Sequence, residues 1–298
     1  PYDEANWIQS NPSLDISVKP DYLRQMSNEG QNGGFLANQR YLRFHANQTV
    51  RSTDRAFDME VFKAAGTGLS DWALADAVAG GIDLGGRDDL ASFALCARFP
   101  LSDGAYRWEF KTWSYISAEC PRDLTKQPFA EWVANGHLIV SDTPVTDLER
   151  DVIEQAYAHR VGRIGFDPAQ AQSTSEKLLA AGIEAVRMSQ RPYMFNEPIT
   201  EMMAALNTNR FVHDGNPVFE WAAGNAHLVM DRQQMVMFDK RSSNDKIDTC
   251  VSAAMALGCC MVAPSTTTDV SMTDKTDNAK TTIEEAVEAY RERIFDGI

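Results

Sequence analysis

The sequence lacks the features that mark several common classes of protein. None of its apolar stretches approaches the ~18 residues needed to cross a bilayer, so we expect no membrane partner. The five cysteines lack the paired spacing of a zinc finger, and Cys250, Cys259 and Cys260 share one apolar run. We expect these three to be small core residues, and a reducing cytoplasm to be the setting of the protein. The chain starts at Pro1 rather than Met, and we expect it to be a portion of a longer protein.

Positive charge is also scarce. The 298 residues include 28 Lys and Arg against 42 Asp and Glu, which gives a formal net charge of −14. This balance excludes a protein that coats nucleic acid through a general basic surface. It is compatible with an enzyme that gathers cations in an acidic pocket. We expect any DNA affinity to be weak and sensitive to salt, because few phosphates would be neutralised.

What the chain does contain is a succession of strand and helix patterns long enough for one large domain. Residues 77–99 predict a β-hairpin, and period-2 alternation over residues 106–116 predicts a third antiparallel strand. Helices and strands then alternate from residue 147 to residue 262, which indicates parallel strands. The predicted fold class is therefore α/β, with a mixed sheet, first antiparallel and then parallel, flanked by helices.

The two ends of the chain differ in composition from this core. We expect three regions: a linker or packing arm at 1–70, the main domain at 71–264, and an acidic tail with a terminal helix at 265–298. Residues 20–30 predict a short helix in the arm, but the mixed apolar and basic residues that follow show no clean period. Residues 117–142 predict a long surface excursion. Residues 217–230 predict a further helix.

Three isolated aspartates carry the chemistry that we expect. Asp83 interrupts an apolar strand, Asp167 ends a later strand, and Asp248 is the one acid inside an apolar helix. A buried carboxylate is costly unless it is paired or bound to a cation. Adjacent parallel strands end side by side, and a helix can cover them, so we expect the three side chains to meet. Such oxygen ligands suit Mg²⁺ or Mn²⁺ rather than zinc, and two ions of this kind support phosphodiester cleavage.

Each aspartate also has a plainer interpretation. Asp83 could form a strand-end turn, Asp167 precedes a proline as in many turns, and Asp248 could be a first-turn acid favoured by the helix dipole. Asp89 is a weaker candidate, because hairpin turns are often rich in Asp and Gly. Each signal is weak alone, and the order strand, strand, helix makes the set more specific.

A basic turn precedes the third aspartate. Lys240, Arg241 and Lys246 are candidate phosphate contacts, and a solvated basic turn is the alternative. His213 and His227 are predicted to be loop and packing residues rather than ligands.

Several stretches, in order, resemble one known family. The run GGIDLGGRDDLASFAL resembles the first hairpin of the C-terminal nuclease domain of tailed-phage terminase large subunits. IGFDPAQA resembles that family's second acidic strand end, and HDGNPVFEWAAGNAHL its Gly-Asn-Pro segment. KRSSNDKIDTCVSAAMAL resembles its lysine-bearing turn and final acidic helix. NPSLDISVKPDYLRQM resembles the linker to the packaging ATPase, so the resemblance covers residues 11–261.

The resemblance implies a ribonuclease H/RuvC-like fold and a metal-dependent endonuclease that cuts concatemeric phage DNA during packaging. It implies that Asp83, Asp167 and Asp248 are catalytic and bind two Mg²⁺ or Mn²⁺ ions, with Asp89 as a weaker neighbour. Where some members carry a further acid one helical turn later, this chain has Ser252. Implied partners are double-stranded DNA, the ATPase domain, the small subunit and the portal, in the host cytoplasm. The chain contains no GxxxxGK[ST] phosphate loop, so we expect it not to translocate DNA by itself.

Two other functions fit parts of the sequence. GIDLGG is similar to the first phosphate loop of sugar kinases and actin-like ATPases, which share the ribonuclease H-like core. Those proteins need a second Asp-Gly loop, and here Asp167 is followed by Pro. A non-catalytic module that docks on a portal or small subunit is a further interpretation, favoured by the acidic tail. Metal-dependent cleavage of supercoiled DNA separates the nuclease from both alternatives.

Overall fold

The computed structural model describes residues 1–32, 34–48, 54–85, 89–169, 172–240 and 245–265. Two expectations lie outside these residues: the phosphate contact of Arg241, and the acidic tail beyond Ser265 with its terminal helix. The chain forms two compact units. The first is Pro1–Asp54 with Arg232–Gln234, and the second contains the rest.

The first unit is helical. Its elements are η1 Glu4–Asn6, α1 Trp7–Ser10, α2 Pro20–Asn32 and α3 Gly34–Phe44. α2 was predicted, whereas α3 was not, because its apolar and basic residues follow no clean helical period. Gly30 lets the two helices approach closely, since a Cβ atom there would lie 2.6 Å from Cβ of Tyr41. Tyr41 is buried and stacks on Tyr2.

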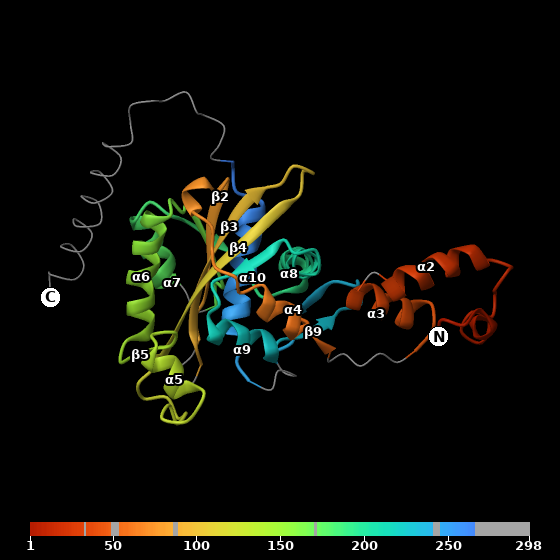
Figure 1. Ribbon diagram of the computed structural model, residues 1–298, viewed down its shortest axis with the longest axis horizontal. Helices are drawn as coiled ribbons and strands as arrows, with labels where there is room; N and C mark the ends of the chain where they lie inside the picture. Colours follow the sequence, from red (N-terminus) through yellow and green to blue (C-terminus); the bar gives the residue numbers. More distant parts are fainter. Residues whose placement is uncertain (33, 49–53, 86–88, 170–171, 241–244, 266–298) are drawn as a thin grey trace. The chain divides into compact units, whose positions relative to one another are not determined.

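The second unit is built on a seven-stranded mixed sheet (Figure 1). The strand order is β5-β4-β3-β2-β6-β7, and β8 pairs with β4. The strands are β2 Ala77–Asp83, β3 Ala91–Pro100, β4 Tyr106–Ser117, β5 Ile139–Ser141, β6 Arg163–Phe166, β7 Glu184–Arg187 and β8 Phe211–His213. β2, β3 and β4 are antiparallel neighbours, and the remaining pairings are parallel. The predicted fold class is confirmed.

Helices cover both faces of this sheet. They are α4 Met59–Ala64, η2 Trp72–Leu74, α5 Phe129–Ala134, α6 Pro144–Ala158, α7 Gln172–Ala180, α8 Pro192–Asn207, α9 Pro217–Asn225 and α10 Asp248–Met261. In Figure 1, α6 and α7 lie on one side of the sheet and α10 lies on the other. α8 packs against α10 on the side away from the sheet. Among the described helices, none is long and apolar enough to cross a bilayer.

Two sequence predictions differ from the structure. The predicted helix over 217–230 is wrong beyond Asn225, where Ala226 turns to an extended conformation. The chain then enters β9 His227–Met230, which pairs antiparallel with β10 Val236–Phe238 in a small sheet that also contains β1 Asp54–Arg55. The predicted surface excursion after β4 contains a helix and a strand, α5 and β5.

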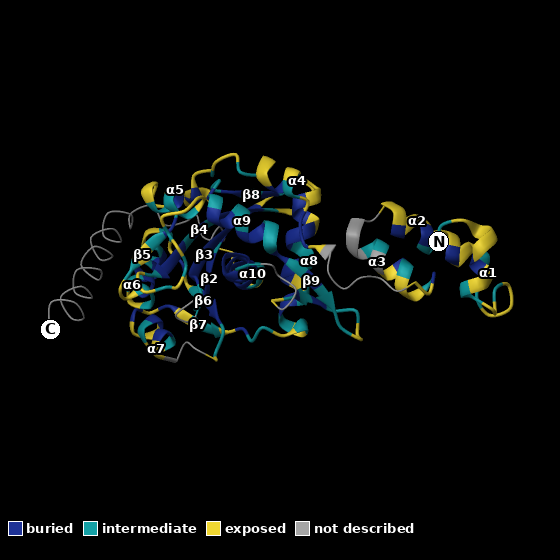
Figure 2. Ribbon diagram, turned by 90° about the horizontal axis from the view of Figure 1, so that it is seen from below, coloured by how far each residue is buried: buried dark blue, intermediate teal, exposed yellow. Residues whose placement is uncertain are grey.

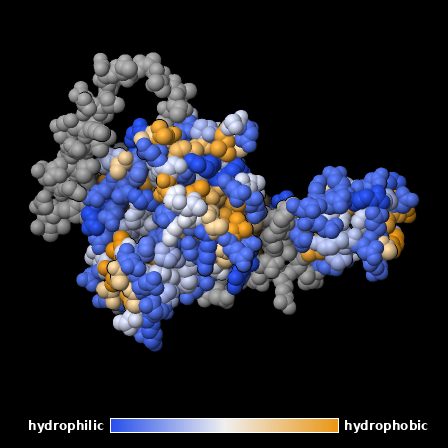
Figure 3. Space-filling model, viewed as in Figure 1, coloured by the Kyte–Doolittle hydropathy of each residue, from blue (hydrophilic) through white to orange (hydrophobic). Residues whose placement is uncertain are grey.

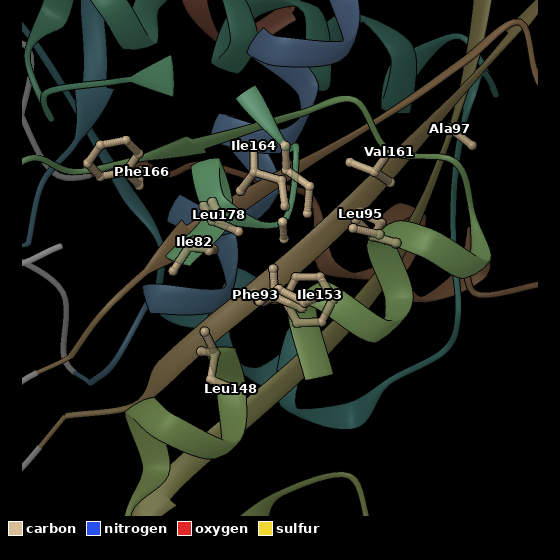
Figure 4. Close-up of a cluster of buried hydrophobic side chains, with 14 of the residues drawn as sticks. Ile82, Phe93, Leu95, Ala97, Leu148, Ile153, Val161, Ile164, Phe166 and Leu178 are labelled. Atoms are coloured by element: carbon tan, nitrogen blue, oxygen red, sulfur yellow. The ribbon is translucent and has the colours of Figure 1, made fainter. Parts of the chain in front are cut away.

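The face covered by α6 and α7 is a continuous apolar core. Phe93 of β3 stacks on Trp113 of β4 with ring centroids 4.3 Å apart. Figure 4 shows Leu148 and Ile153 of α6 packed against Phe93 and its neighbours. Alternation along β2 sends Ile82 into this core and Asp83 to the opposite face. On the face seen in Figure 3, hydrophilic residues cover much of both units, and several hydrophobic patches interrupt them on the second unit.

The opposite face is covered by α10, which is buried almost along its whole length (Figure 2). Gly81 makes backbone contact possible, since a Cβ atom there would lie 2.2 Å from the Ser252 carbonyl oxygen. The C-terminal end of α10 is held by Arg98, whose Nη1 donates to the Cys260 carbonyl at 3.0 Å. Arg98 itself is buried and paired with Asp76 at 2.6 Å. The helix is thus fixed against the centre of the sheet.

We expect Gly81→Ala to lower the free energy of unfolding of the second unit by about 3 kcal/mol, because backbone atoms of α10 would have to move to admit a methyl group. Gly162→Ala is the matched control, since a Cβ atom there meets nothing within 4 Å. Its effect should stay below about 0.5 kcal/mol. Urea unfolding followed by tryptophan fluorescence measures both. Equal stability of the two variants would contradict the close packing of α10 on β2.

Candidate metal centre

The sheet places two of the predicted aspartates at neighbouring strand ends. β2 and β6 run parallel, with Ile82 paired to Phe166. Asp83 and Asp167 are the next residues along the two strands, so their side chains start from the same edge. Asp167 Oδ1 also accepts a hydrogen bond from the Ala169 N–H at 3.0 Å, which is the turn role considered above.

The third aspartate arrives on the helix that covers this edge. Asp248 is the first residue of α10, where an acid also favours the positive end of the helix dipole. Its side chain is 8% exposed, and that of Asp83 is 5% exposed. One pocket of about 220 Å³ gathers the polar side chains Asp83, Asp89, Asp167, Gln190, Lys240 and Asp248. All four predicted acids therefore line one pocket.

Asp83 is held by two side chains from distant parts of the chain. Gln190 Nε2 donates to Asp83 Oδ1 at 2.9 Å, and Lys240 Nζ donates to Oδ2 at 3.1 Å. The same ammonium lies 3.6 Å from Asp248 Oδ1. A single lysine thus faces both buried carboxyl groups. The phosphate contact expected of Lys240 stays a prediction, because this cation is engaged with the acids.

The pKa values of the two buried carboxyl groups, Asp83 and Asp248, are both raised. Burial raises the pKa of Asp83, and the charge of Lys240 only partly opposes that rise. Burial, and then repulsion from Asp83, raises the pKa of Asp248 to about 7. Among the described residues, no N–H or O–H donor reaches the buried Oδ2 of Asp248, and a hydrogen bond between Asp248 and Asp83 requires one of the two carboxyl groups to be protonated. Such an oxygen is costly to bury unless a donor or a cation reaches it.

The donor set fits a hard divalent cation. Carboxylate oxygens are the ligands that Mg²⁺ and Mn²⁺ prefer, and Asp248 lines a pocket together with further carboxylates. Among the described residues, however, no three Asp, Glu, His or Cys side chains already converge as a metal cluster. Lys240 instead supplies the positive charge between Asp83 and Asp248.

A mixed-charge flank, lined by three basic and three acidic side chains, adjoins the acidic pocket. A second pocket of about 430 Å³ shares Asp89, Lys240 and Asp248 with the first, and adds Arg122, Asp245 and Lys246. Lys246 is ion-paired with Asp89. Arg122 forms two hydrogen bonds with Asp245, at 2.7 and 3.1 Å, and lies over the Phe129 ring. Each cation on this flank therefore has an acidic partner.

Sequence reasoning missed Gln190 and Arg122. Both lie in polar turns outside any recognisable motif, and only the folded sheet brings them to the pocket. His213 and His227, expected to be loop and packing residues, both lie in strands, β8 and β9. His213 is fully buried, with Nε2 2.8 Å from the Phe62 carbonyl oxygen.

Comparison with known proteins gives the chain a family. The family model described as terminase large subunit, endonuclease domain, matches residues 1–263. The chain is 24% identical over 272 residues to Protein YmfN of Escherichia coli (strain K12), covering 85% of this chain and 59% of that protein. It is 25% identical over 265 residues to the terminase large subunit of Lactococcus phage p2, covering 86% of this chain and 48% of that protein.

A solved structure shares the fold. The crystal structure of the HK97 bacteriophage large terminase matches with a TM-score of 0.62 at 20% identity, covering 87% of this chain and 54% of that chain. The chain spans about half the length of the curated relatives that it matches. The family match also decides between the two interpretations of GIDLGG, in favour of the nuclease hairpin over the kinase phosphate loop. The chain belongs to the terminase large subunit endonuclease domain family.

Proposed function

We propose that the second unit is a divalent-metal-dependent DNA endonuclease whose centre is Asp83 and Asp248. The observation that carries this proposal is the unpartnered, buried Oδ2 of Asp248 beside a second buried carboxyl group. Asp167 and Asp89 line the same pocket and complete the proposed ligand set. Mg²⁺ or Mn²⁺, as one ion or two, supplies Lewis-acid stabilisation and an activated water for phosphodiester hydrolysis.

The protein groups around the acids have separate roles in this proposal. Gln190 orients the Asp83 carboxylate through a single hydrogen bond. Lys240 offsets part of the repulsion between the two buried carboxyl groups before a cation arrives. Lys246 and Arg241 are the further candidate phosphate contacts, and Lys246 lies on the mixed-charge flank beside the pocket. A phosphate near that flank would sit next to the acidic centre.

The wider role follows from the family. We propose double-stranded phage DNA, in concatemeric form, as the substrate, with cleavage during packaging in the host cytoplasm. The ATPase domain, small subunit and portal are the proposed partners. Residues 1–70 are the proposed linker or packing arm and residues 71–264 the proposed nuclease domain, and residues 55–70 of the arm belong to the second compact unit. Membership of the terminase family and the terminase names of two curated relatives support this. A docking module without chemistry is the competing proposal, since the net charge of −14 favours protein partners.

We expect the purified chain to nick and linearise supercoiled plasmid in Mn²⁺ or Mg²⁺ but not in EDTA. Asp83→Asn should reduce the cleavage rate by more than about 100-fold, because even outer-shell partners of a metal site contribute 10–100-fold. Asp103→Asn is the matched control, since Asp103 caps an exposed hairpin turn through the Ala105 N–H. Wild-type rates for Asp83→Asn would refute the metal role. No cleavage by any form would favour the docking module.

Asp248→Asn should stabilise the protein in EDTA at pH 8 by about 1 kcal/mol, because an amide of the same shape removes one of two facing charges. Mn²⁺ at 100 times its dissociation constant should add about 2.7 kcal/mol to the wild type. The variant should show little of that gain. Urea unfolding with and without Mn²⁺ measures both effects, and an unchanged Mn²⁺ response of the variant would contradict the proposed ligand.

A further inference from the structure

A row of polar side chains crosses the sheet beneath the first turn of α10. The strand register pairs Asp83 of β2 with Ser92 of β3, and Ser92 with Ser114 of β4. Residues directly opposite one another in antiparallel strands project to the same face. The three side chains therefore form one line across three strands, on the face that α10 covers.

Thr249, the residue after Asp248, meets this line from the helix side. Its Oγ1 lies 3.2 Å from Ser92 Oγ and 3.1 Å from Ser114 Oγ. All three residues are 0% exposed. A hydroxyl has one hydrogen and two lone pairs, so Thr249 can donate to one serine and accept from the other. The polar row that begins at Asp83 thus ends in hydrogen bonds to Thr249, the residue that follows Asp248.

The position of these hydroxyls is informative because packing alone does not require them. The next row of the sheet is Gly81, Ala94 and Thr112: Gly81 meets α10 through its backbone, and the Thr112 hydroxyl bonds to Asp214 rather than to the helix. Buried hydroxyls are unfavourable unless paired, and their hydrogen bonds tolerate a narrow range of distance and angle. A hydroxyl bridge therefore fixes the position of the helix more narrowly than apolar contact does.

We propose that Thr249, bridged to Ser92 and Ser114, is a positioning residue that sets the separation of the Asp83 and Asp248 carboxyl groups for metal binding. The inference rests on the proposed function. Arg98 fixes the C-terminal end of α10, and the hydroxyl bridge fixes the end that carries Asp248. Octahedral cations such as Mg²⁺ demand ligand oxygens at near-ideal distances, so a small movement of this helix end weakens binding.

The test is the affinity of the full chain for Mn²⁺, measured by titration calorimetry. Thr249→Val keeps the shape of the side chain and removes the hydroxyl, and we expect Mn²⁺ to bind about tenfold more weakly. Thr249→Ser keeps the hydroxyl and should restore the wild-type affinity. DNA cleavage by Thr249→Val should require more Mn²⁺ and reach the wild-type maximal rate once the metal site is saturated.

Thr174→Val is the matched control. Thr174 is also buried and donates to Glu149 Oε1 at 2.6 Å, between α7 and α6. Its loss should lower the free energy of unfolding and leave Mn²⁺ affinity unchanged. Should Thr249→Val fail to fold, Ser92→Ala and Ser114→Ala each remove one of the two bonds, and each should weaken Mn²⁺ binding with a smaller loss of stability.

Two results with the variants would overturn the inference. One is that Thr249→Val, or both serine variants, bind Mn²⁺ as tightly as the wild type does, in a preparation whose wild type binds Mn²⁺ and cleaves DNA. The proposed function would then stand without the positioning role. The other is that Thr174→Val loses as much Mn²⁺ affinity as Thr249→Val does. The weaker binding would then reflect a general loss of stability of the fold rather than the position of α10. A wild-type chain that binds no Mn²⁺ would refute the proposed function together with this inference.

Discussion

The backbone contact between β2 and α10 is the constraint on which the rest of the second unit depends. At Gly81 the strand and the helix meet with no room for a side chain, and two residues later Asp83 faces the first turn of that helix. A larger residue at Gly81 would lift α10 and carry Asp248 away from Asp83. The strand–helix contact therefore determines both the stability of the core and the geometry of the candidate site.

This close approach has an electrostatic consequence. Two carboxyl groups become buried side by side, and one half-exposed lysine is shared between them. Because the raised pKa of Asp248 reflects burial and repulsion together, the unit bears an unfavourable interaction that a divalent cation would relieve. Unfavourable charge of this kind is typical of functional sites rather than of structural ion pairs, such as the buried pair of Arg98 and Asp76.

Much of the fold follows from local sequence patterns. The hairpin and third strand end within one residue of their predicted limits, because alternation and turn residues define them. The acids were recognisable since a lone carboxylate stands out in an apolar strand or helix, although their metal role stays a prediction. Gln190, Arg122 and Thr249 carry no such signal: amides, arginines and hydroxyls are ordinary in turns and helix ends. Only long-range strand register and helix packing bring them to the site.

The central claim is that the Asp83 and Asp248 carboxylates bind a divalent cation at the place now neutralised by Lys240. Anomalous diffraction from crystals of the chain grown with Mn²⁺ tests this most directly. The account predicts an anomalous peak in contact with both carboxylates, including Asp248 Oδ2, with the Lys240 ammonium moved away from them. Mn²⁺ bound elsewhere, with the Lys240 ion pairs intact, would contradict it.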